Sequence, residues 1–406
     1  MRILVQKFGG TSLSTVHARE HVIAHIKDAL DRRCKLVVVV SAMGRKGDPY
    51  STDTLLELVA QNGNSLPGRE KDLLLCCGEL ISAATLCGLL HARSIPATVL
   101  TGAQAGIVTN ENFGNAQIVA IRPQRIIECL KQGQVVIVAG FQGVTVHNDV
   151  TTLGRGGSDT TATALGVALG AETVDIFTDV NGIFTADPHI VEEARPLSSV
   201  SYSEICHMAY HGAKVIHPRA VEIAMQANLP IRVRSTFSRD TGTVVAGNSA
   251  TGKGSSVQDR YVTGIAHVPN LTQIRVSAGE GRYDLQLSVF KAMAREQISV
   301  DFINVNPSEV VYTVFDEQAG RAVSILREMG YEPDYLSNCA KVSVIGGGMN
   351  GVPGIMARVV EALTEKDIPI LQSADSNTTI WVLVRHSDMA RAVRALHDKF
   401  ELHNLH

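Results

Sequence analysis

Apolar runs of strand length alternate with longer segments of helical periodicity along the first 245 residues. The first three of the clearest runs contain no polar alternation, which is typical of strands covered on both faces. Between the first two runs, apolar residues recur at helical spacing over residues 16–30. The pattern predicts an α/β unit whose mainly parallel sheet carries helices on both faces. The predicted strands lie at 3–5, 36–40, 135–139, 174–177 and 231–233.

A second pattern begins after residues 238–258, a stretch rich in Gly, Ser and Thr that indicates a domain boundary. "VFKAMAREQISV" (289–300) aligns with "VVEALTEKDIPI" (359–370), an offset of 70 residues. Each copy reads strand, helix, strand, strand, helix and closing strand, which predicts two ferredoxin-like βαββαβ modules. We therefore expect an N-terminal unit at 1–245, a linker at 246–262, and modules at 263–337 and 338–406.

Composition narrows the class of protein. At roughly 150 residues per domain, 406 residues suggest two or three domains. The net charge of −3 and the lack of a long basic block argue against a nucleic-acid partner. We expect no apolar run of membrane-helix length and no signal peptide. Seven scattered cysteines without a C-x-x-C indicate reduced thiols in a cytoplasm, not a disulfide framework or zinc site.

The segment "VQKFGGTS" (5–12) is the first candidate for chemistry. Lys7 follows an apolar run, and Gly9 and Gly10 would let main-chain amides approach an anion closely. A glycine turn with a solvated lysine is the alternative. Two further glycine patterns are weaker. "GNSATGKG" (247–254) has Gly254 where a Walker loop requires Ser or Thr, and "GGGMNG" (346–351) fits a strand-to-helix turn of the repeated module.

Three other segments carry polar side chains beside glycines or strand ends. In "GRGGSD" (154–159), Arg155 suits a carboxylate and Asp159 could steer a lysine, although Ser158 or Asp159 could simply cap a helix. "FTDVNGIFTADP" (177–188) puts Thr178 and Asp179 at the end of a strand, where open α/β sheets bind ligands. "HMAYHGAKVIHPRA" (207–220) contains His207 and His211 at helical spacing, but no third zinc ligand is evident.

Together these segments resemble aspartokinase. "KFGGTS", "VVSAMG", "STDTLL", "GELIS", "GRGGSDTTA", "FTDVNGIFTADP" and "GAKVIHPRA" occur in that family's order and approximate spacing, over nearly the whole chain. The repeated modules resemble its paired ACT domains, so the resemblance implies an amino-acid-kinase fold followed by two ACT domains. "VSAMGRKGDPYSTDTLL" and "QSADSNTTIWVLV" look most like the diaminopimelate-responsive isozyme class.

The resemblance implies transfer of the γ-phosphoryl group of ATP to the β-carboxylate of L-aspartate, giving 4-phospho-L-aspartate, in a cytoplasmic homodimer joined through its ACT domains. Magnesium would be coordinated by the ATP phosphates. The implied catalytic residues are Lys7 and Asp159. The implied aspartate site is Ser41, Thr52, Glu79, Arg155, Gly156, Gly157 and Ser158. The implied ATP site is Lys7, Phe8, Gly9, Gly10, Thr178, Asp179, Phe184, Asp187, Lys214 and Val215.

An amino-acid effector is implied at the ACT modules. The second copy keeps the usual Pro353-Gly354 turn, whereas Tyr283-Asp284 stands there in the first. Two positions of the nucleotide site also depart from the family: His189 stands where many members have arginine, and Phe184 replaces a frequent tyrosine. The candidate effector residues are Asn306, Ser308, Pro353, Gly354, Gln372, Ser373 and Asp375.

Two other functions are compatible with this fold. One is a kinase of the same fold that acts on glutamate, N-acetylglutamate, carbamate or uridylate. The other is a catalytically silent amino-acid sensor, against which Lys7, Arg155 and Asp159 argue because all three are present. The paired ACT copies and the combination of Glu79 with Arg155 favour an α-amino acid that has a second carboxylate.

Overall fold

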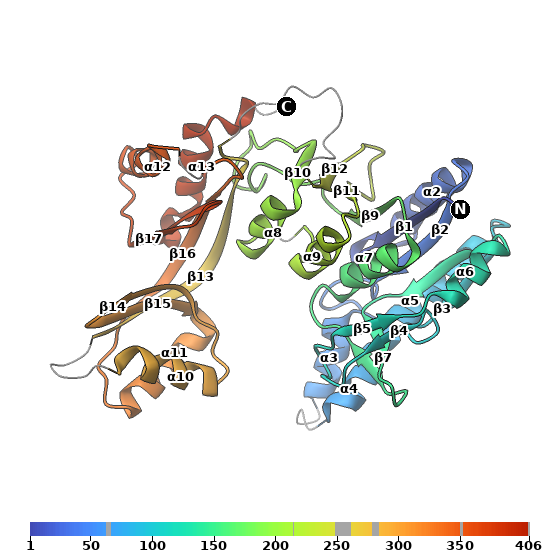
Figure 1. Cartoon of the computed structure of the whole chain (residues 1–406), viewed down its shortest axis with the longest axis horizontal. Helices are drawn as coiled ribbons and strands as arrows, with labels where there is room; N and C mark the ends of the chain where they lie inside the picture. Colours follow the sequence, from blue (N-terminus) through green and yellow to red (C-terminus); the bar gives the residue numbers. More distant parts are fainter. Residues whose placement is uncertain (62–65, 214, 248–260, 278–283, 350–351, 405–406) are drawn as a thin grey trace.

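The computed structural model describes residues 1–61, 66–213, 215–247, 261–277, 284–349 and 352–404. Two bodies lie side by side in Figure 1, an N-terminal unit coloured blue to green and a C-terminal body coloured orange to red. Helix α8 (Tyr202–Tyr210) of the first body faces the long strands of the second. The predicted division into an α/β unit and a repeated ferredoxin-like unit is confirmed as an architecture, while the predicted residue boundaries stay a prediction.

An eight-stranded sheet organises the N-terminal unit, with strand order β10-β12-β11-β9-β1-β2-β6-β3. All pairings from β11 to β3 are parallel, and only β12 runs antiparallel to its neighbour β11. All five predicted strands are present. The strands are β1 (Ile3–Phe8), β2 (Lys35–Val40), β3 (Ala97–Leu100), β6 (Val135–Ala139), β9 (Thr173–Thr178), β10 (Ser199–Ser201), β11 (Ile231–Ser235) and β12 (Thr243–Ala246).

Helices cover both faces of this sheet, as the unalternated strands predicted. Because successive side chains of a strand point to opposite faces, Val5 packs under α7 and α9 whereas Leu4 and Phe8 pack under α2 and α5. Lys7 shares the face of Val5, which is the face of α7. The helices of the unit are α1 (Gly10–Leu13), α2 (Val16–Asp31), α3 (Thr52–Ala60), α4 (Gly68–Leu75), α5 (Cys77–His91), α6 (Gln124–Lys131), α7 (Gly157–Leu169), α8 and α9 (Pro218–Gln226).

A small four-stranded sheet of order β5-β4-β7-β8 extends the unit beside α4. Its strands are β4 (Ile107–Thr109), β5 (Ile118–Ile121), β7 (Gln142–Val144) and β8 (Val150–Thr152). Asp72 of α4 is fully buried and accepts hydrogen bonds from both the main-chain N–H and the hydroxyl of Thr152. This carboxylate therefore fixes the end of β8, from which the glycine loop at 153–157 departs.

Helices α4 and α5 contradict the expectation that no apolar run reaches the length of a membrane helix. Residues Gly68–His91 form a helical stretch long and apolar enough to cross a membrane by length and composition alone. It carries two buried carboxylates, Asp72 and Glu79, and α5 packs its apolar side chains under the central sheet. These features are those of a core helix, and the expectation that no apolar run approaches membrane length is wrong.

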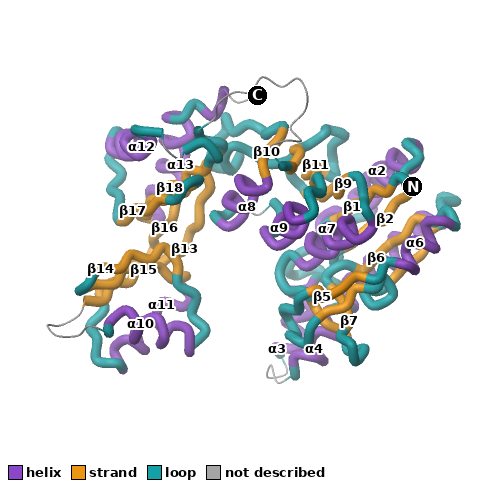
Figure 2. Tube along the Cα trace, in the orientation of Figure 1, coloured by secondary structure: helices purple, strands orange, loops and turns teal. Residues whose placement is uncertain are grey.

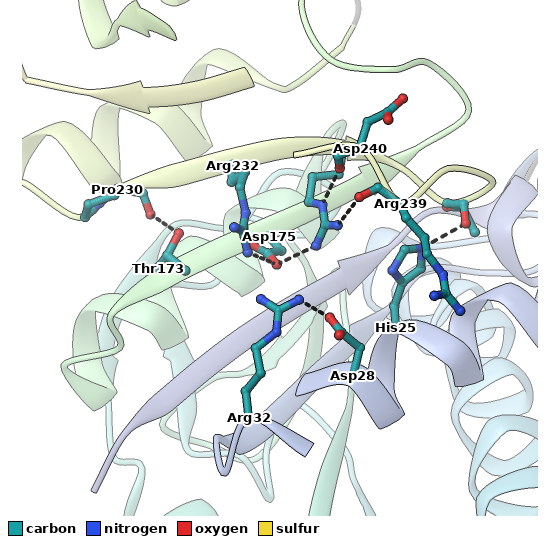
Figure 3. A network of polar contacts seen from close by, with 11 residues as sticks. His25, Asp28, Arg32, Thr173, Asp175, Pro230, Arg232, Arg239 and Asp240 are labelled. Atoms are coloured by element: carbon teal, nitrogen blue, oxygen red, sulfur yellow. Dashed lines mark hydrogen bonds and ion pairs between the residues drawn. The ribbon is translucent and has the colours of Figure 1, made fainter. Parts of the chain in front are cut away.

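A buried ion pair joins the neighbouring strands β9 and β11 (Figure 3). Asp175 is fully buried and accepts two hydrogen bonds from Arg232, at 2.9 Å from Nε and 2.7 Å from Nη2. Nη1 of Arg234 lies 3.6 Å from the same carboxylate, and the Arg234 guanidinium also covers the ring of Phe177. Two arginines thus compensate one buried charge, as a desolvated carboxylate requires.

One continuous six-stranded sheet, of order β14-β15-β13-β16-β18-β17, runs through the C-terminal body (Figure 2). The elements are β13 (Gly264–Ser277), α10 (Leu285–Arg295), β14 (Asp301–Asn306), β15 (Glu309–Phe315), α11 (Asp316–Glu328), β16 (Asp334–Ile345), α12 (Ile355–Thr364), β17 (Gln372–Asp375), β18 (Thr379–Arg385), η1 (His386–Asp388), α13 (Met389–Lys399) and η2 (Leu402–Asn404).

The two modules share strands, and this corrects the expected order of the second copy. The second half of β13 pairs with β15 in the first module, whereas residues 264–268 of the same strand pair with residues 341–345 of β16 in the second. After α13 the described residues contain only the short η2, not the closing strand that the repeat suggested. The second module therefore takes its closing strand from the first half of β13, ahead of the part of that strand that pairs with β15.

Candidate active site

A pocket of about 300 Å³ opens at the carboxyl ends of β1 and β2 and at the start of α7. Parallel pairing explains the convergence, because β1, β2, β6 and β9 all end at the same edge of the sheet. The pocket collects ten predicted site residues: Lys7, Gly10, Ser41, Thr52, Glu79, Arg155, Gly156, Gly157, Ser158 and Asp159. Seven others also line it: Ala42, Gly44, Arg45, Ser51, Asp53, Phe141 and Gly154.

Lys7 and Asp159 form an ion pair in this pocket. Nζ of Lys7 lies 2.7 Å from Oδ1 of Asp159, and the two side chains are 13% and 12% exposed. Lys7 reaches α7 because it lies on the α7 face of β1, and Asp159 lies in the first turn of that helix. The other oxygen of Asp159 accepts a hydrogen bond from the main-chain N–H of His217 at 3.3 Å. The ammonium is thus held in a fixed place beside the pocket.

The glycines after β1 permit close approach of main chain. A Cβ atom on Gly10 would lie 2.6 Å from the carbonyl oxygens of both Ala42 and Gly44, so a side chain does not fit. The Gly44 N–H in turn donates to the Gly10 carbonyl at 3.0 Å. The helix that follows the glycines is the single turn α1, which is too short to add much dipole. Lys7 therefore supplies the main positive charge on this side of the pocket.

The glycine loop at 153–157 leads directly into α7. Gly156 is the residue before the helix, with a left-handed φ of 69°, and a Cβ there would lie 2.2 Å from Cγ of His217. Ser158 and Asp159 lie within the first turn and neither side chain caps the helix, so that alternative interpretation is wrong. Arg155 is exposed and lines the pocket from this loop.

Glu79 is a buried carboxylate that faces the pocket. It is 2% exposed, its Oε1 accepts a hydrogen bond from the Ala42 N–H at 3.0 Å, and its Oε2 has no partner among the described residues. Burial raises the pKa of Glu79 to about 8, which the Ala42 hydrogen bond only partly offsets. A cationic group brought to Oε2 would favour the ionised form.

Of the residues predicted for the nucleotide, the described ones lie outside the pocket lining, with the exceptions of Lys7 and Gly10. Thr178 is the last residue of β9 and Asp179 follows it, while the ring of Phe8 is buried and stacks on Phe177. Phe184 packs against the core of the second C-terminal module, and Val215 packs against the core under α7.

The remaining positions of the predicted nucleotide site are Asp187, His189 and Lys214. Asp187 accepts a hydrogen bond from the main-chain N–H of His189 at 2.9 Å, and His189 is exposed in the turn that follows. Lys214 lies outside the described residues. The structure brings Thr178, Asp179 and Lys7 to one edge of the sheet, and it does not gather Phe184 or Asp187 into the same pocket.

Arg45 is the most informative pocket residue that the sequence interpretation missed. Its Nη2 lies 2.5 Å from Oδ2 of Asp179, so the loop after β2 is joined to the loop after β9. The pair is exposed, with side chains 71% and 41% accessible. Its position in "SAMGRKG", directly after a predicted buried strand, was the signal that could have identified it.

A second pocket, of about 430 Å³, lies in the second C-terminal module. Of the predicted effector residues, Pro353, Gly354 and Asp375 line it, and Gly354 with φ 91° directly precedes α12. Gln372 is instead buried between the modules, where it hydrogen-bonds the Gln273 side chain and the Phe302 carbonyl. Ser373 is exposed on β17, and Asn306 and Ser308 are exposed near the end of β14, in the first module.

The described residues contain one group that could hold a metal, His397, Asp398 and His403, whose ligand atoms lie within 4.8 Å of one another. Atoms about 2.0–2.2 Å from one zinc ion lie no more than about 4.4 Å apart, so a group of ligand atoms within 4.8 Å of one another is not by itself a zinc site. Nε2 of His397 also already bonds the Thr185 hydroxyl at 3.0 Å. All seven cysteines are free thiols.

Comparison with known proteins agrees with this geometry. The model of the amino acid kinase family matches residues 2–235, and an ACT domain model matches residues 335–398. Aspartokinase 1 of Bacillus subtilis is 56% identical over 402 residues, which cover 99% of this chain and 100% of that protein. Two crystal structures of Escherichia coli aspartokinase III, each 25% identical, cover 98% of this chain and 99% of their own. The complex with aspartate and ADP (R-state) gives a TM-score of 0.79, and the complex with lysine and aspartate (T-state) gives 0.77.

Proposed function

This chain belongs to the aspartokinase family and is an ATP-dependent kinase that acts on aspartate, and from that premise we propose which residues perform the transfer. Lys7 with the Gly9 and Gly10 amides binds the ATP phosphates, and Asp159 orients Lys7. The observation that carries the proposal is the Lys7–Asp159 ion pair in a pocket that also contains Arg155 and Glu79. An anion-binding cation and two groups suited to an amino acid thus lie within one site.

The chemistry requires little more than approach and charge compensation. The β-carboxylate of aspartate, with a pKa of about 3.9, is already a nucleophile at neutral pH, so no strong base is needed. The barrier lies in bringing this anion to a polyanion and in stabilising charge on the transferring group. Lys7 contributes that stabilisation where the charge develops. Magnesium on the ATP phosphates would neutralise part of their charge.

The substrate end of the pocket matches the charges of an amino acid. We assign the unpaired oxygen of Glu79 to the substrate ammonium and the Arg155 guanidinium to a substrate carboxylate. Ser41, Thr52, Gly156, Gly157 and Ser158 line the same pocket. Thr178, Asp179, Phe184, Asp187, Lys214 and Val215 remain our proposal for the rest of the nucleotide site.

Regulation is proposed at the second ACT module, with diaminopimelate as the favoured effector. The pocket beside Gly354 offers main-chain amides at the start of α12 for a carboxylate and the Asp375 carboxylate for an ammonium. On this basis the enzyme would open the route to lysine, diaminopimelate, methionine and threonine, as a cytoplasmic homodimer joined through its ACT domains.

An assay of ADP release tests the substrate assignment. The enzyme is incubated with ATP and magnesium and with L-aspartate, L-glutamate or no acceptor. Release with aspartate alone is the expected result. Equal release with glutamate would assign a related kinase, and no release with any acceptor would favour an amino-acid sensor.

A further inference from the structure

Helix α8 is hydrogen-bonded to the second ACT module through two histidines. Nε1 of Trp381, on β18, donates to Nε2 of His211 at 3.0 Å, and Nε2 of His207 bonds the Thr378 hydroxyl at 2.9 Å. His211 directly follows α8 and is only 9% exposed. Trp381 also packs edge-on against Phe302 of the first module, with ring centroids 6.4 Å apart. These histidines therefore connect the two bodies and are not a metal face.

The next helix, α9, is coupled to α8 by both polar and apolar contacts. The Tyr210 hydroxyl donates to Oε1 of Glu222 at 2.7 Å. Met208 of α8 and Val221 of α9 belong to one buried cluster that continues under α7. Because buried side chains are close-packed, a displacement of α8 would be transmitted to α9.

Residues at the start of α9 contact the glycine loop at 153–157. Arg219 donates to the main-chain carbonyls of Leu153 and Ala116, each at 2.9 Å. The His217 N–H donates to Asp159, and its ring lies against the α-carbon of Gly156. Contacts from two residues of one helix end thus fix both ends of the loop that carries Arg155.

We propose that α8 and α9 connect the second ACT module mechanically to the glycine loop at 153–157, with Arg219 and His217 as positioning residues. The Trp381–His211 and Thr378–His207 hydrogen bonds form the regulatory end of this connection. A shift of β18 then changes how Arg155 meets aspartate, without any direct contact between the ACT module and the substrate. The inference rests on the proposed aspartate-binding role of Arg155, but it requires no particular effector.

A double-mutant cycle in aspartate kinetics tests the connection without any effector. Trp381→Phe removes the indole N–H but keeps an aromatic ring, and Arg219→Lys keeps the charge but loses the two-carbonyl geometry. We expect each to raise the aspartate KM about threefold to tenfold, with the ATP KM changed less than about twofold. The double variant should exceed the larger single effect by less than about twofold, because both changes release the same loop.

Controls separate this proposal from general loosening. Thr378→Val repeats the test at the other hydrogen bond and should also raise the aspartate KM. Arg394→Met removes a different contact between the bodies, the bond from Arg394 Nη1 to the Ile190 carbonyl, and should leave it unchanged. The connection would be overturned if the two single effects on the aspartate KM multiplied in the double variant. It would also be overturned if Trp381→Phe and Thr378→Val both had a normal aspartate KM. Arg155→Ala in the same series tests the substrate role on its own.

Discussion

The Nζ atom of Lys7 lies 2.7 Å from Oδ1 of Asp159, although the two residues are separated by most of the N-terminal unit in sequence. The pair forms because β1 directs Lys7 towards the face covered by α7, whose first turn carries Asp159. Few cations in the site are held this firmly: Arg155 and Arg45 are both exposed. Lys7 is therefore the charge best placed to act without rearrangement during phosphoryl transfer.

Replacing Lys7 with alanine should lower kcat by about 10²–10³, because it removes charge stabilisation that matters most in the transition state. Folding should change less than kcat, because Asp159 keeps the hydrogen bond that its other oxygen accepts from the His217 N–H. Steady-state kinetics and thermal unfolding measure the two effects. Lys27→Ala, an exposed lysine on α2, is the matched control. An unchanged kcat would remove Lys7 from the mechanism.

Replacing Arg155 with alanine should raise the aspartate KM by about tenfold or more while the ATP KM stays near its original value. The reason is that a charge-assisted contact with a carboxylate contributes about 1.5–3 kcal/mol. Initial rates at varied aspartate and saturating ATP provide the measurement. Arg122→Ala, at an exposed residue directly after β5 and outside the pocket lining, serves as control. A normal aspartate KM would retire the assignment of Arg155.

Glu79 predicts a pH dependence of substrate capture. Burial raises the pKa of Glu79 to about 8, so at pH 7 the free enzyme holds mostly the protonated acid. An ammonium group binds the carboxylate form, and kcat/KM for aspartate should therefore rise from pH 6 to about pH 8. In Glu79→Gln this rise should disappear and the aspartate KM should increase. A wild-type profile that is flat between pH 6 and pH 8.5 would argue against Glu79 as the ammonium site.

The raised pKa of Glu79 also predicts that the folding stability of the ligand-free enzyme falls as the pH rises. The folded pKa of Glu79 lies above the ordinary value of 4.5, so folding favours the protonated acid. Its stabilising contribution is complete below pH 4.5 and is lost as the pH rises towards about 8. Glu79→Gln should therefore be more stable than the original enzyme at pH 8.5 and similar at pH 5. Urea unfolding of the ligand-free protein at both pH values measures the difference, and an equal difference at both would contradict it.

Local patterns predicted the elements of this chain better than its long-range pairings. The unalternated run at 36–40 identified β2 because complete burial leaves a local signature, whereas nothing local shows that β13 serves both modules. The motifs found Lys7, Arg155 and Glu79, and parallel pairing then explains why they meet. The structural role of His211 was not predicted, because its partner Trp381 lies 170 residues away in the sequence. The helical spacing of His207 and His211 carries no information about that partner.

Effector binding should depend on Asp375 in the second ACT module. We expect diaminopimelate to inhibit the enzyme, and Asp375→Asn to weaken that inhibition by about tenfold, because the Asp375 carboxylate lines the pocket and can pair with an ammonium group. Separate titrations with diaminopimelate, lysine and threonine provide the measurement. Asp367→Asn changes an exposed carboxylate of the same module outside the pocket and should have no effect. A response to lysine alone would overturn diaminopimelate as the effector.

The buried pair in Figure 3 should dominate the electrostatic contribution to the stability of the N-terminal unit. Asp175 is fully buried with Arg232 and Arg234, whereas Asp28 and Arg32 form a pair that is half exposed. Removing one member of a buried pair leaves an uncompensated charge and costs about 3–5 kcal/mol, while an exposed pair is worth less than about 1 kcal/mol. We therefore expect Arg232→Met to lower the free energy of unfolding by several times more than Arg32→Met. Urea denaturation followed by circular dichroism compares the two variants directly. Equal losses would mean that water reaches Asp175 and that the pair behaves as a surface contact.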